Sequence, residues 1–72
     1  MTKLYLAIPC YNEEDVLRDS ASKLSDKFSK MMHDGKITHD SKIVFIDDGS
    51  KDRTWSIICE LHSENPVIQG IK

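Results

Sequence analysis

The stretch that decides the fold is Ile43-Val44-Phe45-Ile46-Asp47-Asp48-Gly49-Ser50. Its first four residues are apolar and mostly β-branched, which predicts a short buried strand. Two aspartates and a glycine follow at once, and residues of these types form tight turns. A buried strand that leads into a polar turn is typical of a parallel α/β sheet, in which ligands bind beyond the carboxyl ends of the strands. We therefore expect a strand at about 43–47 and a binding site directly after it.

A second strand-and-turn unit lies at the start of the chain. The apolar run Leu4-Tyr5-Leu6-Ala7-Ile8 ends at Pro9 and predicts a strand at about 4–9 that is covered on both faces. Asn12 is the expected N-cap of a helix. Three acidic residues that suit the positive end of a helix dipole come next: Glu13, Glu14 and Asp15. This pattern predicts a helix at about 13–32.

The spacing of apolar residues supports two helices. In the first helix they recur every three or four positions and form one stripe: Leu17, Ala21, Leu24, Phe28 and Met31. A second helix is expected at about 52–63, capped by Ser50 or Asp52, with three large residues on its buried side: Trp55, Ile58 and Leu61. Asn65-Pro66 ends that helix, and a third strand is expected at about 67–71.

The order of these elements, β-α-β-α-β, predicts a Rossmann-like α/β fold with a parallel sheet and right-handed crossovers. Consecutive strands of such a sheet lie side by side, so the turns after the first two strands meet at one edge. Five polar residues are therefore expected around one small volume: Tyr11, Asn12, Glu13, Asp47 and Asp48.

The composition indicates a small folded domain. The chain has 72 residues with 10 Lys and Arg against 12 Asp and Glu, and the scattered basic residues argue against nucleic-acid binding. A chain of this length buries only about 60% of its unfolded surface, so we expect residues 1–72 to be the N-terminal part of a longer domain. We find no signal peptide and no apolar run of roughly 20 residues, which predicts a cytoplasmic location. Cys10 and Cys59 have no Cys or His at metal-ligand spacing and are expected to be reduced, packing thiols.

The two adjacent aspartates need polar partners, because burying an unpaired carboxylate is costly. Successive strand residues point to opposite faces, so one of Asp47 and Asp48 is expected to face the ligand and the other to support it. Asp47 could equally well cap its own turn by accepting backbone N–H groups of residues 49–51.

The residue types around the turns suit a nucleoside. A carboxylate accepts the N–H edge of a base such as uracil or guanine, and the ring of Tyr11 could stack on the base. Glu13 could accept from ribose hydroxyls, although Glu13 and Glu14 could also serve only the helix dipole. Neither a G-x-G-x-x-G motif nor a P-loop motif occurs, so dinucleotide binding and P-loop phosphate binding are not indicated.

Two motifs carry a resemblance to a known family: Ile8-Pro9-Cys10-Tyr11-Asn12-Glu13-Glu14 and Ile46-Asp47-Asp48-Gly49-Ser50-Lys51-Asp52-Arg53-Thr54. They resemble the N-terminal, nucleotide-binding part of family 2 glycosyltransferases with the GT-A fold. Within that family they are most similar to dolichol-phosphate mannose synthases and bactoprenol glucosyltransferases. The resemblance implies that five residues line the nucleotide pocket: Pro9, Tyr11, Glu13, Ile46 and Asp48. It also implies that Asp48 reads the edge of the base and that Asp47 supports it. We expect three further supporting residues: Asn12, Gly49 and Ser50.

The same resemblance implies an enzyme of glycan or cell-wall biosynthesis. Such an enzyme transfers a hexose from a UDP- or GDP-sugar to a polyprenyl phosphate or glycan acceptor, at the cytosolic face of the membrane. Mg²⁺ or Mn²⁺ would be held by an Asp-any-Asp motif beyond residue 72, and the catalytic base would lie beyond it. Residues 1–72 would then hold no catalytic residue and no metal ligand, and this segment alone would be inactive.

Two alternatives stay open at this point. One is a receiver-type signalling module with a Mg²⁺-binding acidic cluster, although in that fold the acidic pair follows the first strand, where this chain has Pro9-Cys10-Tyr11. The other is a non-catalytic, truncated remnant that folds by pairing its open sheet edge with another copy.

Overall fold

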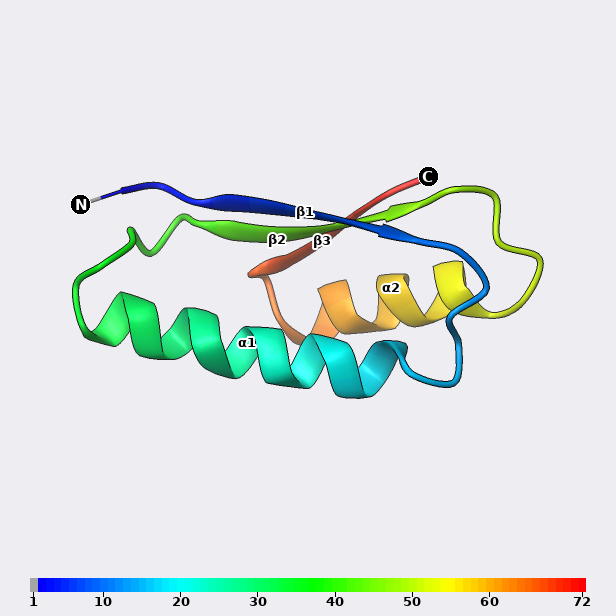
Figure 1. Cartoon of the computed structure of the whole chain (residues 1–72), viewed down its shortest axis with the longest axis horizontal. Helices are drawn as coiled ribbons and strands as arrows, with labels where there is room; N and C mark the ends of the chain where they lie inside the picture. Colours follow the sequence, from blue (N-terminus) through cyan, green and yellow to red (C-terminus); the bar gives the residue numbers. More distant parts are fainter. Residues whose placement is uncertain (1) are drawn as a thin grey trace.

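The chain folds into a three-stranded parallel sheet with two helices. The computed structural model describes residues 2–72, in five elements: β1 (Tyr5–Cys10), α1 (Leu17–His33), β2 (Lys42–Asp47), α2 (Thr54–Glu64) and β3 (Ile68–Ile71). The strand order is β1-β2-β3, and both pairs of neighbouring strands are parallel (Figure 1). The predicted Rossmann-like α/β fold, its element order and its parallel sheet are confirmed.

The register of the strands aligns their carboxyl ends. Pro9 is paired with Ile46 and Cys10 with Asp47, at the last two positions of β1 and β2. On the other side of β2, Ile46 is paired with Ile71 at the end of β3. The segments that follow β1 and β2 therefore leave the sheet at the same edge.

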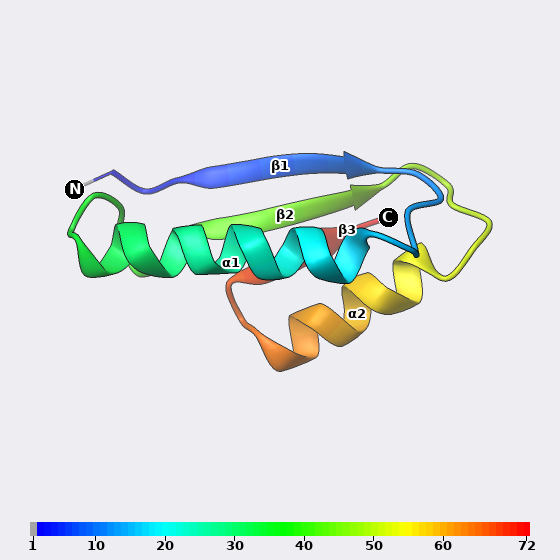
Figure 2. The same ribbon diagram turned by 60° about the horizontal axis from the view of Figure 1, so that its bottom comes forward.

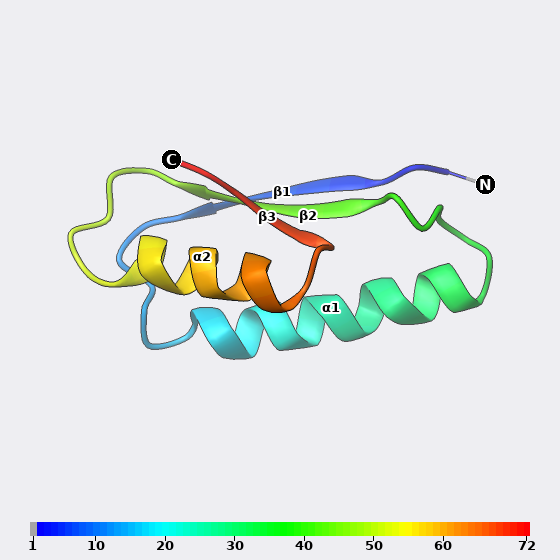
Figure 3. The ribbon, with the colours of Figure 1, turned by 180° about the vertical axis from the view of Figure 1, so that it is seen from behind.

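Both helices cover the same face of the sheet. Figures 1 and 3 show α1 and α2 on one side of the strands, and Figure 2 shows them next to each other. The two crossovers, β1-α1-β2 and β2-α2-β3, are both right-handed and both move to the next strand on the same side, so their helices lie on the same face. In β2 the buried residues Ile43 and Phe45 alternate with half-buried Val44 and Ile46.

The opposite face of the sheet is open within the described residues. Tyr5 on β1 is 60% exposed and Ile71 on β3 is 55% exposed. The prediction that the first strand is covered on both faces is therefore wrong for residues 2–72. An apolar run indicates that a strand can be buried on both faces, but two helices that lie on one face cannot cover the other.

The core lies between the sheet and the helices. The predicted stripe of α1 is confirmed, since Leu17, Ala21 and Phe28 are buried, while Leu24 and Met31 are half-buried against the core. The buried side of α2 differs from the prediction. Ile58 is buried as expected, but Ile57 and Thr54 are buried beside it, and Trp55 and Leu61 are only partly covered.

Gly70 allows β3 to approach α2 closely. A Cβ atom at position 70 would lie 2.4 Å from Cγ2 of Ile58 and 3.3 Å from the ring of Trp55. Such distances are shorter than van der Waals contact, so a side chain at this position would push α2 away from the sheet.

None of the helices within residues 2–72 has the length and apolar character needed to cross a membrane.

The start of α1 differs from the prediction. The helix begins at Leu17, four residues later than expected, and its N-cap position is Val16, which makes no side-chain capping hydrogen bond. Asn12 has a φ of 51°, and its Oδ1 accepts a hydrogen bond from the backbone N–H of Lys51. Asn12 is therefore not an N-cap, because its side chain is used in a contact with a distant segment. The start of α2 at Thr54 lies close to the predicted position.

Candidate functional site

Two loops meet at the carboxyl edge of the sheet. Loop 1 comprises residues 11–16 between β1 and α1, and loop 2 comprises residues 48–53 between β2 and α2. Both loops lie at the right of Figure 1. The backbone N–H of Asp48 donates a hydrogen bond to the carbonyl oxygen of Cys10 at 3.0 Å, which extends the ladder of β1 and β2 past the end of both strands. The expected meeting of the two turns is thus present in the structure.

Asn12 and Ser50 join the two loops. The backbone N–H of Asn12 donates to Oγ of Ser50 at 2.9 Å, and the N–H of Lys51 donates to Oδ1 of Asn12 at 2.8 Å. The left-handed backbone of Asn12 is one that asparagine adopts more readily than most residues. Asn12 and Ser50, which are among the expected supporting residues, hold the loops to each other.

A second set of hydrogen bonds joins loop 1 to the start of α2. The backbone N–H of Glu13 donates to Oγ1 of Thr54 at 2.8 Å, and the N–H of Glu14 donates to Oδ2 of Asp52 at 3.2 Å. The hydroxyl of Thr54 donates in turn to Oδ1 of Asp52 at 2.5 Å. We call Asp52, Thr54 and these two backbone amides the Asp52–Thr54 clasp.

The clasp affects the ionisation of Asp52. The hydroxyl hydrogen bond from Thr54 lowers the pKa of the Asp52 carboxyl, and backbone hydrogen bonds from Thr54 and Glu14 act in the same direction. Asp52 is therefore ionised at neutral pH. The sequence pattern indicated Asp52 only as a helix cap and did not indicate Thr54. The sequence signal that could have indicated Thr54 is its position two residues after Asp52, directly before the apolar residues of α2.

Asp47 supports the turn in loop 2. Its side chain is buried, and its Oδ1 accepts a hydrogen bond from the backbone N–H of Ser50 at 2.9 Å. Its Oδ2 is also buried and has no hydrogen-bond partner within residues 2–72. The interpretation of Asp47 as the cap of its own turn is confirmed. Gly49 follows with a φ of 80°, a backbone conformation that favours glycine.

The two cysteines differ in their surroundings. Cys10 is buried at the end of β1, and Cys59 is exposed on α2. Burial raises the pKa of the Cys10 thiol to about 11, and the negative charges of Glu13 and Asp47 add to this effect. The prediction of a reduced, packing thiol is confirmed for Cys10, but Cys59 does not pack into the core.

The residues that the resemblance assigns to the nucleotide lie at one end of the sheet. Pro9 and Ile46 are neighbours in the register of β1 and β2 and occupy the face that carries no helix. Tyr11 is 53% exposed, Asp48 is exposed and Glu13 is half-buried. The backbone N–H of Asp48 donates a hydrogen bond to Cys10, the residue before Tyr11, so Tyr11 and Asp48 lie on adjacent segments. Their contact with a nucleotide stays a prediction.

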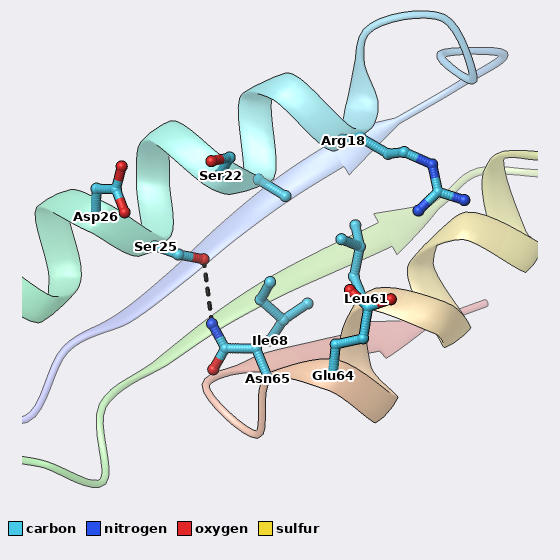
Figure 4. Close-up of a pocket in the computed structure, with 9 residues that line it drawn as sticks. Arg18, Ser22, Ser25, Asp26, Leu61, Glu64, Asn65 and Ile68 are labelled. Atoms are coloured by element: carbon cyan, nitrogen blue, oxygen red, sulfur yellow. Dashed lines mark hydrogen bonds between the residues drawn. The ribbon is translucent and has the colours of Figure 1, made fainter.

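The site does not coincide with either cavity described in this structure. A cavity of about 340 Å³ lies between the two helices, and Figure 4 shows Ser25 of α1 and Asn65 beyond α2 joined across it by a hydrogen bond. A second cavity of about 160 Å³ lies between α2 and Gly70 of β3. No residue of loop 1 or loop 2 lines either of these two cavities.

The described residues do not fit a divalent metal ion. Within residues 2–72 no group of three His, Cys, Asp or Glu side chains is placed to hold one. The unpartnered Oδ2 of Asp47 is enclosed by protein, and Asp48 stands alone at the surface. The Mg²⁺ or Mn²⁺ that the resemblance implies therefore has no ligand set within residues 2–72.

Comparison with known proteins identifies relatives. A family model described as "Glycosyl transferase family 2" matches residues 5–72. The "Uncharacterized glycosyltransferase YkoT" of Bacillus subtilis is 39% identical over 69 residues, which cover 96% of this chain and 20% of that protein. A dolichol-phosphate mannosyltransferase of Pyrococcus furiosus is 34% identical over 65 residues, which cover 90% of this chain and 16% of that protein.

A third relative is the UDP-N-acetylglucosamine–dolichyl-phosphate N-acetylglucosaminyltransferase of Methanococcus voltae. It is 36% identical over 58 residues, which cover 81% of this chain and 19% of that protein. The chain spans about a fifth of the length of these relatives. No solved structure matches the chain.

Proposed function

Because this chain belongs to glycosyltransferase family 2, we propose that it forms the donor-nucleotide-binding part of an enzyme that transfers a hexose from a UDP- or GDP-sugar. One observation carries the proposal. The hydrogen bond from Asp48 N–H to Cys10 O places the segment that bears Tyr11 beside the segment that bears Asp48. An aromatic ring and a free carboxylate on adjacent loops are the two groups that would hold a nucleobase.

Each assigned residue has a role that its position supports. The exposed ring of Tyr11 would stack on the base, and the exposed carboxylate of Asp48 would accept a hydrogen bond from the imide or amide N–H of the base. Pro9 and Ile46 would form an apolar floor on the open face of the sheet. Glu13 would accept from the ribose hydroxyls.

The acceptor is proposed from the names of two relatives, and the location is carried over from the family resemblance. Two relatives are named for the transfer of a sugar to dolichyl or dolichol phosphate. A polyprenyl phosphate at the cytosolic face of a membrane is therefore the acceptor that we propose for the whole enzyme. The metal ion and the catalytic base would be held by residues outside 1–72, and Asp-any-Asp is the motif that would hold the metal. The receiver-type alternative has no observation in its favour once the family is known.

A titration of the isotope-labelled chain with UDP and with GDP tests the proposal. We expect the backbone amide signals of Tyr11, Glu13 and Asp48 to shift with at least one nucleotide. Asp48→Ala removes a hydrogen bond to a charged acceptor worth about 1.5–3 kcal/mol, so affinity should fall roughly 10- to 150-fold. Asp26→Ala, which changes an exposed carboxylate on α1, is the matched control and should bind as the unmodified chain does. If the chain is folded and its amide signals from loop 1 and loop 2 do not shift with either nucleotide, the proposal is contradicted.

A further inference from the structure

The backbone amides of Glu13 and Glu14 donate hydrogen bonds to side chains that are distant in the sequence. Residues that lead into a helix commonly satisfy such amides with a side chain from the same turn. In this structure the partners are Thr54 and Asp52, which are 41 and 38 positions away in the sequence. The N-cap position of α1 makes no side-chain hydrogen bond. Loop 1, just before α1, is thus held by hydrogen bonds to loop 2 and to the first residue of α2.

The geometry of Thr54 makes this tie specific. The side chain of Thr54 is fully buried, and its single hydroxyl both accepts from Glu13 N–H and donates to Oδ1 of Asp52. The backbone N–H of Thr54 also donates to Oδ1 of Asp52 at 2.9 Å. A hydroxyl that has one donor and one acceptor partner in fixed directions leaves loop 1 little freedom to move relative to α2.

The clasp is distinct from the groups that would face a ligand. Buried Thr54 cannot touch a nucleotide on the surface, and both oxygens of Asp52 are used within the clasp. Tyr11 precedes Glu13 and Glu14 by two and three residues, and Asp48 precedes Asp52 by four. Without the clasp, loop 1 would therefore be free to move relative to loop 2, and either nucleotide would have to bear the same cost of ordering the loops on binding.

We propose that Asp52 and Thr54 are positioning residues for the donor nucleotide, because they hold loop 1 against loop 2. This inference rests on the proposed function. It adds that the affinity for the nucleotide depends on two residues that never contact it. It also predicts how the two kinds of residue differ. Loss of the clasp weakens UDP and GDP binding by the same factor, whereas loss of Asp48 changes the ratio between them, because Asp48 reads the base edge.

The variants Thr54→Val and Thr54→Ser test the proposal in the full 72-residue chain. Valine keeps the shape of threonine but has no hydroxyl, while serine keeps the hydroxyl. We expect Thr54→Val to bind UDP and GDP at least 10-fold more weakly with an unchanged UDP-to-GDP ratio, and Thr54→Ser to stay within about twofold of the unmodified chain. Thr38→Val is the matched control, since Thr38 also donates its hydroxyl to an aspartate, Asp40, but lies before β2 at the opposite edge of the sheet.

Hydrogen exchange at the backbone amide of Glu13 supplies a second measurement that does not depend on nucleotide. This amide should be protected in the unmodified chain and in Thr54→Ser and should exchange rapidly in Thr54→Val. If Thr54→Val does not fold, Asp52→Ala removes the hydrogen bond from Glu14 at a half-buried position and takes its place. The same equal weakening of both nucleotides is expected for it.

The outcomes separate the two proposals. If the unmodified chain binds a nucleotide and the clasp variants bind it equally well despite rapid exchange at Glu13, the positioning role is wrong and the proposed function stands. A change in the UDP-to-GDP ratio in the clasp variants would also overturn the positioning role. If the unmodified, folded chain binds neither nucleotide, the proposed function fails and the inference fails with it.

Discussion

The backbone N–H of Asp48 donates a hydrogen bond to the carbonyl oxygen of Cys10 at 3.0 Å. This bond continues the parallel ladder beyond the last paired residues of β1 and β2, Cys10 and Asp47. Loops that leave a sheet normally diverge, but here the first residue of loop 2 is still held to the last residue of β1. Tyr11 and Asp48, which follow Cys10 and Asp47, therefore lie on adjacent segments at the same edge of the sheet.

Stacking on Tyr11 is the first property to test. Tyr11→Ala should weaken nucleotide binding by about 1–3 kcal/mol, which is roughly five- to 150-fold, because a stacked base loses its aromatic partner. Tyr11→Phe keeps the ring and should bind nearly as well as the unmodified chain. Tyr5→Ala is the control, since Tyr5 is an equally exposed tyrosine at the other end of β1. Equal binding by Tyr11→Ala, measured by calorimetry, would argue against stacking.

The clasp should make stability depend on acid pH. The pKa of Asp52 is lower in the folded chain than its unfolded value of about 3.9, so the ionised form stabilises the fold above that pH. This stabilisation is lost as the pH falls through the folded value. Urea unfolding of the unmodified chain and of Asp52→Asn at pH 6 and pH 3 checks this. The unmodified chain should be the more stable at pH 6, and the difference should shrink at pH 3. If the difference in the free energy of unfolding between the unmodified chain and Asp52→Asn were the same at both pH values, this pH dependence would be contradicted.

The two thiols should differ in reactivity. The thiolate is the reactive form, and burial raises the pKa of Cys10 to about 11, so very little of it is ionised at pH 8. Cys59 is exposed on α2. Alkylation with iodoacetamide at pH 8, followed by mass spectrometry of peptides, should label Cys59 quickly and Cys10 only after urea is added. Equal labelling of both thiols in the folded chain would show that the end of β1 opens readily.

Gly70 should be required for packing and not for its backbone freedom. Gly70→Ala places a Cβ atom against Ile58 and Trp55 and should destabilise the fold by about 1–3 kcal/mol, the usual cost of overpacking. Gln69→Ala, at the neighbouring exposed position of β3, should change stability by less than about 0.5 kcal/mol. The midpoints of thermal unfolding measure both. An unchanged midpoint for Gly70→Ala would mean that α2 can shift without cost.

The regular elements could be predicted because their signals are local. The apolar run at 43–46 and the three-and-four spacing from Leu17 to Met31 describe buried surfaces that only a strand or a helix presents. The structure places β2 and α1 accordingly. The buried side of α2 was predicted less well. Its apolar residues Ile57 and Ile58 are adjacent, and both are buried in the structure, whereas the three-residue spacing from Trp55 to Leu61 pointed to Ile58 alone.

The details of the site were predicted in part. The pairing of the two turns and the capping role of Asp47 followed from general rules about parallel sheets and aspartate turns. The roles of Asn12 and Thr54 did not. A local rule makes Asn12 a helix cap, but its side chain bonds to the amide of Lys51, which is 39 positions away. Partners at such distances cannot be inferred from the spacing of residues along the chain.

The sequence by itself determined the strands, the helices, their parallel order and the edge at which the polar turns meet, because each depends on the preferences of neighbouring residues. Only the tertiary structure decided that both helices lie on one face and that loop 1 is bonded to loop 2 and to the first residue of α2. Those features depend on hydrogen bonds and packing between residues far apart in the chain. Such contacts exist only after the sheet has brought the two loops together.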